Sequence, residues 1–379
     1  MEFRLTSQQE EAQEKFRSVV SEEISPHADQ YDREECMPSE VVGKLAELGG
    51  MGAIIPKEYG GREMDPITFG LLCEEVGRGS GSLLSILTVH GMICQAILKW
   101  GSPDQKACWL PKLANGEALG AFGLTEPGIG SDAKNVETTA EASDDTYLLN
   151  GEKKWISFGQ MANLFLIMAQ HEGKPSAFLV QRETPGFSTE PISGLLGFRS
   201  AMLAKVHLNE CRIPKENLVG RAGFGFSHVA GAALDHGRYC VAWGSVGMAR
   251  ACLEACLRYT SERKQFGACL KEHQLIQQMI AEMITNFHAA KMLCLNAGYL
   301  KEIGEPRVIM ETSMAKYFAS RIAFRAASDA VQIHGANGCG DEYPVQRYLR
   351  DAKITEIIEG STQIQEMIIS RFGYHSFRY

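Results

Sequence analysis

The end of the chain contains four short stretches that decide how the sequence is interpreted: QIHGANG at 332–338, YPV at 343–345, RDAK at 350–353 and IEGSTQIQ at 358–365. The last stretch predicts a turn followed by a helix, because Gly360 permits a sharp turn and Thr362 with Gln365 forms a capping-box pattern. Glu359 stands at this predicted helix entrance, after two isoleucines. An isolated glutamate is normally solvated, but these two neighbours make the local surroundings of Glu359 apolar.

Three earlier segments precede these stretches. Residues 123–132 read GLTEPGIGSD, residues 155–157 read WIS and residues 263–267 read RKQFG. The first segment combines glycines with hydroxyl side chains, and its N–H and O–H groups could hold a phosphate or the polar edge of a cofactor. Taken alone, it would be an ordinary glycine-rich turn. The chain has no phosphate-binding GxxxxGK[ST] motif, and GFG at 223–225 lacks the third glycine of a dinucleotide-binding turn.

The composition excludes several classes of protein. The 379 residues are 45% hydrophobic and 22% charged with a net charge of -8, so we expect no nucleic-acid partner and no anionic membrane surface as partner. No apolar run approaches the ~18 residues of a membrane span, and no signal peptide is visible, which predicts a cytoplasmic protein. Eleven cysteines without a CxxC pair indicate reduced core thiols, and no metal site is expected.

The spacing of apolar residues divides the chain into three parts. Helical periodicity predicts helices over 10–24, 66–76, 83–100 and 104–113, the first of them started by a capping box at Thr6. From about residue 120 the period becomes two, as in a β domain, and a hairpin turn is expected at Asn150-Gly151. Helical periodicity returns after residue 225, with Pro306 at the start of a helix that ends near residue 333. We therefore expect an α+β fold with an N-terminal helical domain (1–118), a middle β domain (119–228) and a C-terminal helical domain (229–379).

Together, these segments resemble the acyl-CoA dehydrogenase family of flavoproteins over essentially the whole chain. The resemblance implies that the middle domain is a β-barrel or sandwich and that the C-terminal domain is a four-helix bundle. It implies FAD as cofactor, an acyl thioester as substrate and an electron-transfer flavoprotein as electron acceptor. It also implies a homotetramer built as a dimer of dimers.

The resemblance assigns cofactor contacts residue by residue. In the family the middle domain holds the flavin, and the matching residues here are Phe122, Leu124, Thr125, Ser131, Trp155 and Ser157. The residues that reach FAD in a neighbouring subunit correspond to Arg263, Gln265 and Phe266. The loop near the pyrophosphate and adenosine corresponds to Gln332, Gly335 and Ala336, and the resemblance adds Ser361 and Gln363 as further cofactor contacts.

Glu359 is the residue expected to carry the chemistry. Removing an α proton and a β hydride from an acyl thioester requires a base and a hydride acceptor on opposite faces, and in the family a carboxylate and flavin N5 supply them. Some members carry the base on an earlier helix, at the position of Gly237, which has no side chain here. Asp235 and Arg238 on that helix either support the active-site floor or form an ordinary i,i+3 ion pair. The resemblance gives as substrate-binding residues Ser131, Asp235, Arg238 and Gly360.

The sequence departs from the family pattern at a few positions. Ile129 replaces a small residue, Ala336 a second glycine and Ser361 a commoner threonine, and none of these changes removes a functional group. Residues 200–204 read SAMLA and residues 339–342 read CGDE. Both segments resemble members that serve polyketide and nonribosomal-peptide assembly, where an acyl carrier protein replaces coenzyme A.

Other functions are compatible with the same segments. An oxidase on this scaffold would pass electrons to oxygen, and a flavin-dependent monooxygenase would not need Glu359. A non-catalytic FAD-binding protein would use the fold to bind a partner. His334 and His273 lie near the motifs, but no metal-ligand spacing accompanies them, so we expect both to be hydrogen-bonded side chains.

Overall fold

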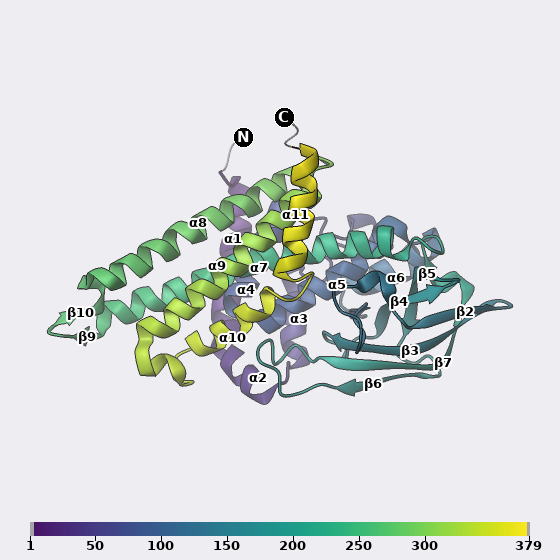
Figure 1. Cartoon of the computed structure of the whole chain (residues 1–379), viewed down its shortest axis with the longest axis horizontal. Coiled ribbons are helices and arrows are strands. Elements are labelled where there is room, and N and C mark those ends of the chain that lie inside the picture. Colours follow the sequence, from purple (N-terminus) through teal and green to yellow (C-terminus); the bar gives the residue numbers. More distant parts are fainter. Residues whose placement is uncertain (1–3, 377–379) are drawn as a thin grey trace.

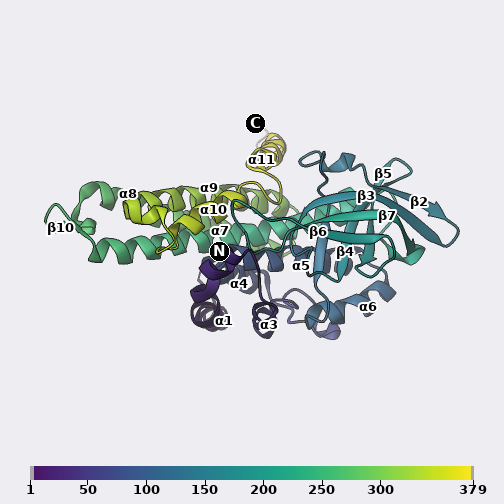
Figure 2. The same ribbon diagram turned by 90° about the horizontal axis from the view of Figure 1, so that it is seen from below.

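The computed structural model describes residues 4–376 of the chain. A bundle of long helices lies beside a curved mixed sheet, and the N-terminal helices lie against both (Figures 1 and 2). The α-helices are α1 (Ser7–Val19), α2 (Ala28–Glu34), α3 (Ser39–Glu47), α4 (Pro66–Gly79), α5 (Gly81–Trp100), α6 (Pro103–Ala114), α7 (Gly231–Glu262), α8 (Gln274–Glu302), α9 (Val308–His334), α10 (Val345–Thr355) and α11 (Thr362–Ser376). The strands are β1 (Gly120–Gly123), β2 (Thr139–Ser143), β3 (Thr146–Ile156), β4 (Leu164–His171), β5 (Lys174–Gln181), β6 (Phe187–Pro191), β7 (Ala204–Pro214), β8 (Leu218–Val219), β9 (Lys264–Gln265) and β10 (Ala268–Cys269).

Side-chain caps encoded in the sequence start the N-terminal helices. The Thr6 hydroxyl accepts the backbone N–H of Gln9, and the Gln9 side chain accepts the N–H of Thr6, so the predicted capping box is confirmed. Asp65 and Ser80 accept N–H groups at the starts of α4 and α5, and both helices are buried over most of their length. Three of the predicted helices correspond to α4, α5 and α6, and the first corresponds to α1 and its continuation.

Eight strands of the described residues form one mixed sheet, in the order β6-β7-β3-β2-β4-β5-β8 with β1 paired in parallel to β4. The β character of this part is confirmed, but the predicted hairpin turn at Asn150-Gly151 is wrong, because β3 runs through these residues. Gly151 has φ 147° and lies at a register shift between β3 and β7, where a Cβ would come 2.6 Å from Thr138 Oγ1. The glycine therefore serves a β-bulge, and the chain reverses at Asp144-Asp145.

The central helix of the C-terminal part is α7, which packs against α4, α5, α8 and α9. Its residues are buried on several sides, and Trp243 is fully enclosed. A Cβ on Gly77 of α4 would lie 2.5 Å from the carbonyl oxygen of Gly244 on α7. Glycine at this crossing therefore allows the two backbones to approach closely, which brings α4 and α5 against the bundle.

The helix predicted after Pro306 starts later than expected. It begins at Val308, so Pro306 lies two residues before the helix and not at its first position. The reason is a turn in which the N–H of Val308 donates to the carbonyl of Glu305. The predicted end near residue 333 is confirmed, since α9 ends at His334.

Two helical segments are long and apolar enough to cross a membrane by length and composition. These are α5 and the segment 225–262, which ends in α7. Their apolar windows are 89% and 78% buried inside the protein. Both segments therefore have the environment of core helices, which explains why they are apolar on several sides.

Candidate active site

A cavity of about 810 Å³ lies where the sheet meets the helices. The loop after β1, the end of β3, the segment 193–198, α5, α7 and the turn before α11 contribute to its lining. Most residues predicted for the flavin and the substrate meet here, namely Phe122, Leu124, Thr125, Ser131, Trp155, Ser157, Arg238, Glu359, Gly360 and Ser361. Sequence analysis did not single out Ser85, Thr88 and Val89 of α5, because their helical spacing is that of any core helix.

A buried ion pair holds one wall of the cavity. Lys153 Nζ lies 2.6 Å from Glu126 Oε1, and both side chains are almost completely buried. Glu126 also accepts the backbone N–H groups of residues 137–138, and Lys153 donates to the carbonyl of Leu124. The pair therefore fixes the loop after β1, which carries three of the predicted flavin contacts on the cavity wall: Leu124, Thr125 and Ser131.

Burial acts against both charges of this pair. It lowers the pKa of Lys153 to about 8, although Glu126 opposes the shift. Burial alone would raise the pKa of Glu126, but the N–H of Glu137 and the Lys153 ammonium outweigh it, so that pKa is lowered. Sequence analysis missed both residues. The available signal was strand alternation, which places Lys153 on the buried face with Tyr147 and Leu149.

The backbone at Trp155 is left-handed, with φ 64°. Such a conformation costs about 1–3 kcal/mol for a bulky residue and persists only where neighbouring contacts impose it. Lys154 donates its N–H to Thr125 on one side, and Phe158 donates its N–H to Ala201 on the other. These bonds hold the indole at the cavity, where it is 48% exposed.

Glu359 lines the same cavity from the turn before α11. Its Oε2 is buried without a hydrogen-bond partner, and its backbone is left-handed at φ 56°. Burial raises the pKa of this carboxyl to about 7, and the positive charges of Arg238 and Lys316 limit the shift. A carboxyl group that titrates near neutrality and has a free oxygen can take up or release a proton.

Gly237 provides the space that the Glu359 carboxylate occupies. A Cβ at Gly237 would lie 2.5 Å from Glu359 Oε2 and 3.1 Å from Met92 Sδ. A side chain at position 237 would therefore displace the carboxylate, so the two alternative base positions cannot both be occupied. Of the two acidic residues on the described cavity lining, Glu126 is tied to Lys153, which leaves Glu359 as the unpaired carboxylate.

Asp235 and Arg238 do not form the i,i+3 ion pair that their spacing permits. Asp235 instead pairs with Lys301, because α8 packs alongside α7 and brings that lysine to it. Arg238 Nε donates to the carbonyl oxygen of Glu359 at 3.1 Å. Arg238 thus supports the residue that carries the free carboxylate, whereas Asp235 lies outside the described cavity lining.

The start of α11 differs from the prediction. Thr362 is the first residue of the helix, and its N–H and hydroxyl both donate to the carbonyl of Glu356. The Gln365 amide donates to the carbonyls of Glu359 and Gly360 at 3.1 and 3.0 Å. The Thr362–Gln365 capping box is therefore wrong, because both side chains bind carbonyl groups of the turn and not N–H groups of the helix.

The remaining predicted cofactor residues lie away from the cavity. The β9–β10 hairpin is at the end of the bundle far from the sheet (Figures 1 and 2), and its Phe266 is 98% exposed. Tyr259 joins this end of α7 to the loop after α9: its hydroxyl donates to the carbonyl of His334 at 3.3 Å and accepts from Asn337 at 3.0 Å. We call six predicted residues the distal cluster: Arg263, Gln265, Phe266, Gln332, Gly335 and Ala336. Gln363 is exposed on α11, outside the described cavity lining.

The two histidines near the motifs are hydrogen-bonded, as expected. His334 Nδ1 lies 2.8 Å from the carbonyl of Ala330, and His273 Nε2 lies 3.1 Å from the carbonyl of Gln265. Among the side chains that the structure describes, in residues 4–374, no group of three histidine, cysteine or acidic side chains could hold a metal ion. These histidines therefore need no catalytic explanation.

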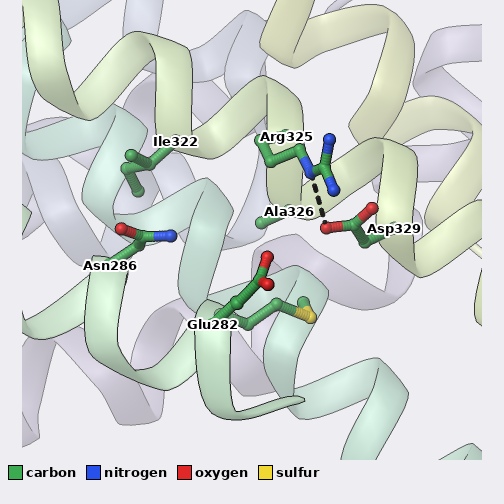
Figure 3. Close-up of a pocket in the computed structure, with 7 residues that line it drawn as sticks. Glu282, Asn286, Ile322, Arg325, Ala326 and Asp329 are labelled. Atoms are coloured by element: carbon green, nitrogen blue, oxygen red, sulfur yellow. Dashed lines mark hydrogen bonds and ion pairs between the residues drawn. The ribbon is translucent and has the colours of Figure 1, made fainter. Parts of the chain in front are cut away.

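A second crevice lies between α8 and α9 (Figure 3), and it is much smaller than the cavity. Arg325 and Asp329 form an ion pair at its edge, and Glu282 and Asn286 face it from α8. Its volume of about 10 Å³ has room for no more than a single water molecule. The large cavity is therefore the candidate active site.

Family models match three consecutive parts of the chain. They are described as the N-terminal domain of acyl-CoA dehydrogenase (residues 6–117), its middle domain (121–211) and its C-terminal domain (223–373). The chain belongs to the acyl-CoA dehydrogenase family. A curated relative, the glutaryl-CoA dehydrogenase of Desulfococcus multivorans, is 38% identical over 98% of this chain and 97% of its own.

Solved structures agree with this membership. A glutaryl-CoA dehydrogenase from Mycobacterium smegmatis in complex with FADH2 has a TM-score of 0.92 and 27% identity, covering 99% of this chain and 97% of its own. The prolyl acyl carrier protein oxidase AnaB has a TM-score of 0.93 and 29% identity, covering 97% of this chain and 99% of its own. Acyl-CoA dehydrogenases are FAD-dependent flavoproteins, and FAD is the cofactor of this one.

The cavity of this family member suits a flavin. Trp155 offers a flat aromatic face, and Thr125, Ser131 and Ser157 bring hydroxyl groups to the same wall. The volume of about 810 Å³ lies within the range of cofactor pockets. The residues present therefore fit both the ring and its polar edge.

We expect Lys153→Met to destabilise the cavity wall. The variant leaves Glu126 buried and charged without its partner, and breaking a buried pair in this way costs about 3–5 kcal/mol. Thermal unfolding should occur at a lower temperature, and FAD should be lost more readily on gel filtration. Lys205→Met, which breaks a surface pair with Glu190 on the same sheet, should leave both properties unchanged. Retention of FAD by Lys153→Met at the level of the unaltered protein would show that the pair does not hold the wall.

Proposed function

We propose that this protein removes hydrogen from the α and β carbons of an acyl thioester, with Glu359 as the base for the α proton. The carboxyl of Glu359 carries the proposal: its Oε2 has no partner, its pKa is raised to about 7, and it shares the cavity with Trp155 and Ser157. FAD, held by Trp155, Ser157 and the loop after β1, would supply the acceptor for the β hydrogen, which would leave as a hydride. A monooxygenase would have no use for such a base.

The protein's own groups prepare the proton transfer. A general base is most effective when its pKa lies near the working pH, and burial brings Glu359 there. Arg238 holds the backbone of Glu359, and Gly237 leaves its carboxylate space. Entry of an acyl chain expels water from the cavity, which raises the pKa further and strengthens the base.

The distal cluster supports a shared cofactor site. We propose that it contacts FAD bound to a neighbouring chain in a homotetramer built as a dimer of dimers. Its residues lie at the far end of the bundle, and an exposed aromatic side chain such as Phe266 is typical of a protein interface. Arg263 would supply charge-assisted hydrogen bonds to a phosphate.

We propose an acyl carrier protein as the carrier of the acyl group, an electron-transfer flavoprotein as electron acceptor and a cytoplasmic location. The departure at residues 200–204 supports the carrier, since it borders the cavity through Leu203. The similar AnaB is named a prolyl acyl carrier protein oxidase, which also favours this carrier. Because AnaB is named an oxidase, oxygen is the alternative electron acceptor for a protein with this fold.

Glu359→Gln tests the base directly. The change keeps the volume of the side chain and removes the basic carboxylate, so flavin reduction by a competent thioester should slow by at least ~10²-fold. FAD content and assembly should persist. Glu356→Gln is the matched control, because the Glu356 carboxylate binds Lys353 outside the described cavity lining. Reduction of Glu359→Gln at the unaltered rate would refute the base.

The pH dependence of kcat/KM is a second test of Glu359 as the base. Below a pKa of about 7 the Glu359 carboxyl is neutral and cannot accept a proton, so kcat/KM should rise as the pH increases through this value. The rise should be absent from the residual activity of Glu359→Gln. A profile that is flat from pH 5.5 to 8.5, about one and a half units on each side, contradicts the assignment.

Arg263→Ala tests the shared site. Loss of its guanidinium should weaken FAD binding and assembly together, because one side chain would serve both. Fluorimetric titration with FAD and analytical ultracentrifugation measure the two properties. Lys271→Ala, another exposed cation next to the hairpin, should change neither. Unaltered FAD affinity in Arg263→Ala would count against a cofactor shared between chains.

A comparison of carriers tests the substrate. The same acyl group should reduce the flavin with a higher kcat/KM on an acyl carrier protein than on coenzyme A. Stopped-flow mixing without oxygen measures both substrates through bleaching of the flavin. Equal values for a broad set of simple fatty acyl-CoAs would show that coenzyme A thioesters are the substrates.

A further inference from the structure

Lys316, in the first half of α9, is a buried cation that the proposed reaction does not use. Its side chain is fully buried. Within the described residues, no carboxylate lies within ion-pair distance of the ammonium, which donates to the carbonyl oxygens of Gly360 at 2.9 Å and of Glu356 at 3.5 Å. Lysine is almost never fully buried without a partner, since desolvation of its charge is costly. Such a residue therefore calls for a functional explanation.

The two carbonyls that bind Lys316 belong to the turn at 356–360, on either side of Glu359. The backbone there is left-handed at both Glu359 (φ 56°) and Gly360 (φ 90°). Glycine adopts this conformation freely, but a glutamate does so only where its surroundings impose it. The position of the carboxylate therefore depends on groups outside the turn.

Side chains of three helices supply these groups. Arg238 of α7 donates to the carbonyl of Glu359, and Gln365 of α11 donates to those of Glu359 and Gly360. The Thr362 hydroxyl of α11 donates to the carbonyl of Glu356. Lys316 of α9 donates to the carbonyls at both ends of the turn. Its ammonium ties the turn to α9, which packs along α7.

We propose that Lys316 is a positioning residue for Glu359: its ammonium ties together the carbonyls of Glu356 and Gly360 and so keeps the carboxylate of the residue between them at the cavity. The proposal rests on the proposed role of Glu359 as base. It gives the buried charge a task that a neutral, apolar side chain of the same length would not perform.

The charge of Lys316 also acts on the carboxylate. The charged groups that face the turn are Arg238 from α7, Lys316 from α9, and the pair Lys353–Glu356 from the end of α10, while α5 presents the neutral Met92. Burial lowers the pKa of Lys316 to about 8, and the negative charge of Glu359 opposes that shift. Removal of the ammonium should therefore move the pKa of Glu359 above its value of about 7.

Lys316→Met and Lys316→Gln separate positioning from charge. Methionine removes both the donors and the charge, whereas glutamine keeps an amide donor without the charge. Lys353→Met is the matched control, since Lys353 binds the side chain of Glu356 and not the carbonyls of the turn. Each purified holoprotein is compared for FAD content, assembly, thioester affinity, flavin reduction over a range of pH, and the infrared carboxyl band that Glu359→Gln lacks.

In Lys316→Met, flavin reduction at saturating thioester should fall by roughly 10²-fold, the scale expected from a misplaced reacting group. FAD content, assembly and thioester affinity should stay close to those of the unaltered protein. The rise of rate with pH and the infrared band of Glu359 should both move to higher pH. Lys316→Gln should recover part of the rate while keeping the pH shift. Lys353→Met keeps both carbonyl bonds of the turn, so it should keep the rate of flavin reduction at saturating thioester.

Two outcomes would overturn the positioning role. One is an intact Lys316→Met that reduces its flavin at the unaltered rate with an unmoved pH profile, while Glu359→Gln is inactive. The other is loss of FAD, assembly and rate together in both Lys316 variants, which would assign the lysine to general stability. If Glu359 is not the base, Glu359→Gln will remain active. That result is distinct from the two outcomes above.

Discussion

The active site depends on a turn that the chain does not favour by itself. A left-handed conformation costs a residue with a side chain about 1–2 kcal/mol, and a buried hydrogen bond contributes about 1 kcal/mol. One donor would barely offset the strain at Glu359, whereas the three donors Arg238, Lys316 and Gln365 exceed it. Each donor belongs to a different helix, so the position of the Glu359 carboxylate depends on how the helices of the C-terminal bundle pack. The long apolar helices α5 and α7 matter for the site because they form the buried interior of that packing.

Both walls of the cavity use a buried lysine, but with opposite electrostatic results. Lys153 binds a carboxylate directly, and the pKa of Glu126 is lowered, which suits a residue that only holds a loop. Lys316 binds carbonyl groups and leaves the neighbouring carboxylate without a direct partner, so burial raises the pKa of Glu359. An ion pair at Glu359 would hold the residue equally well and would remove its basicity. The two carboxylates thus differ in whether an ammonium group binds them directly. Glu126 is bound and has a structural role, whereas Glu359 is not bound and can react.

Local signals in the sequence predicted much of this architecture, and interactions between distant segments account for what was missed. Helix caps such as Thr6 act within one turn of chain, so they can be recognised from spacing alone. Asn150-Gly151 has the composition of a hairpin turn, yet its glycine serves a bulge that only the pairing of β3 with β7 explains. Lys316 occupies a helix position that would normally be solvated, and nothing nearby in sequence shows that α9 turns it towards residues 356–360. Ten of the residues predicted from the family motifs line one cavity, whereas the distal cluster lies at another end of the molecule.

Helix α7 carries Arg238 at the cavity and ends one residue before Arg263 of the distal cluster. At 1.5 Å per residue, these two positions are separated by roughly 38 Å along one continuous rod. A chain therefore cannot bend its own distal cluster back to its own cavity without breaking its central helix. If the cluster serves a neighbour, as proposed, retention of the cofactor follows mass action between chains. Dilution alone would then strip the flavin from the protein, and the yellow colour of a solution would depend on how concentrated it is.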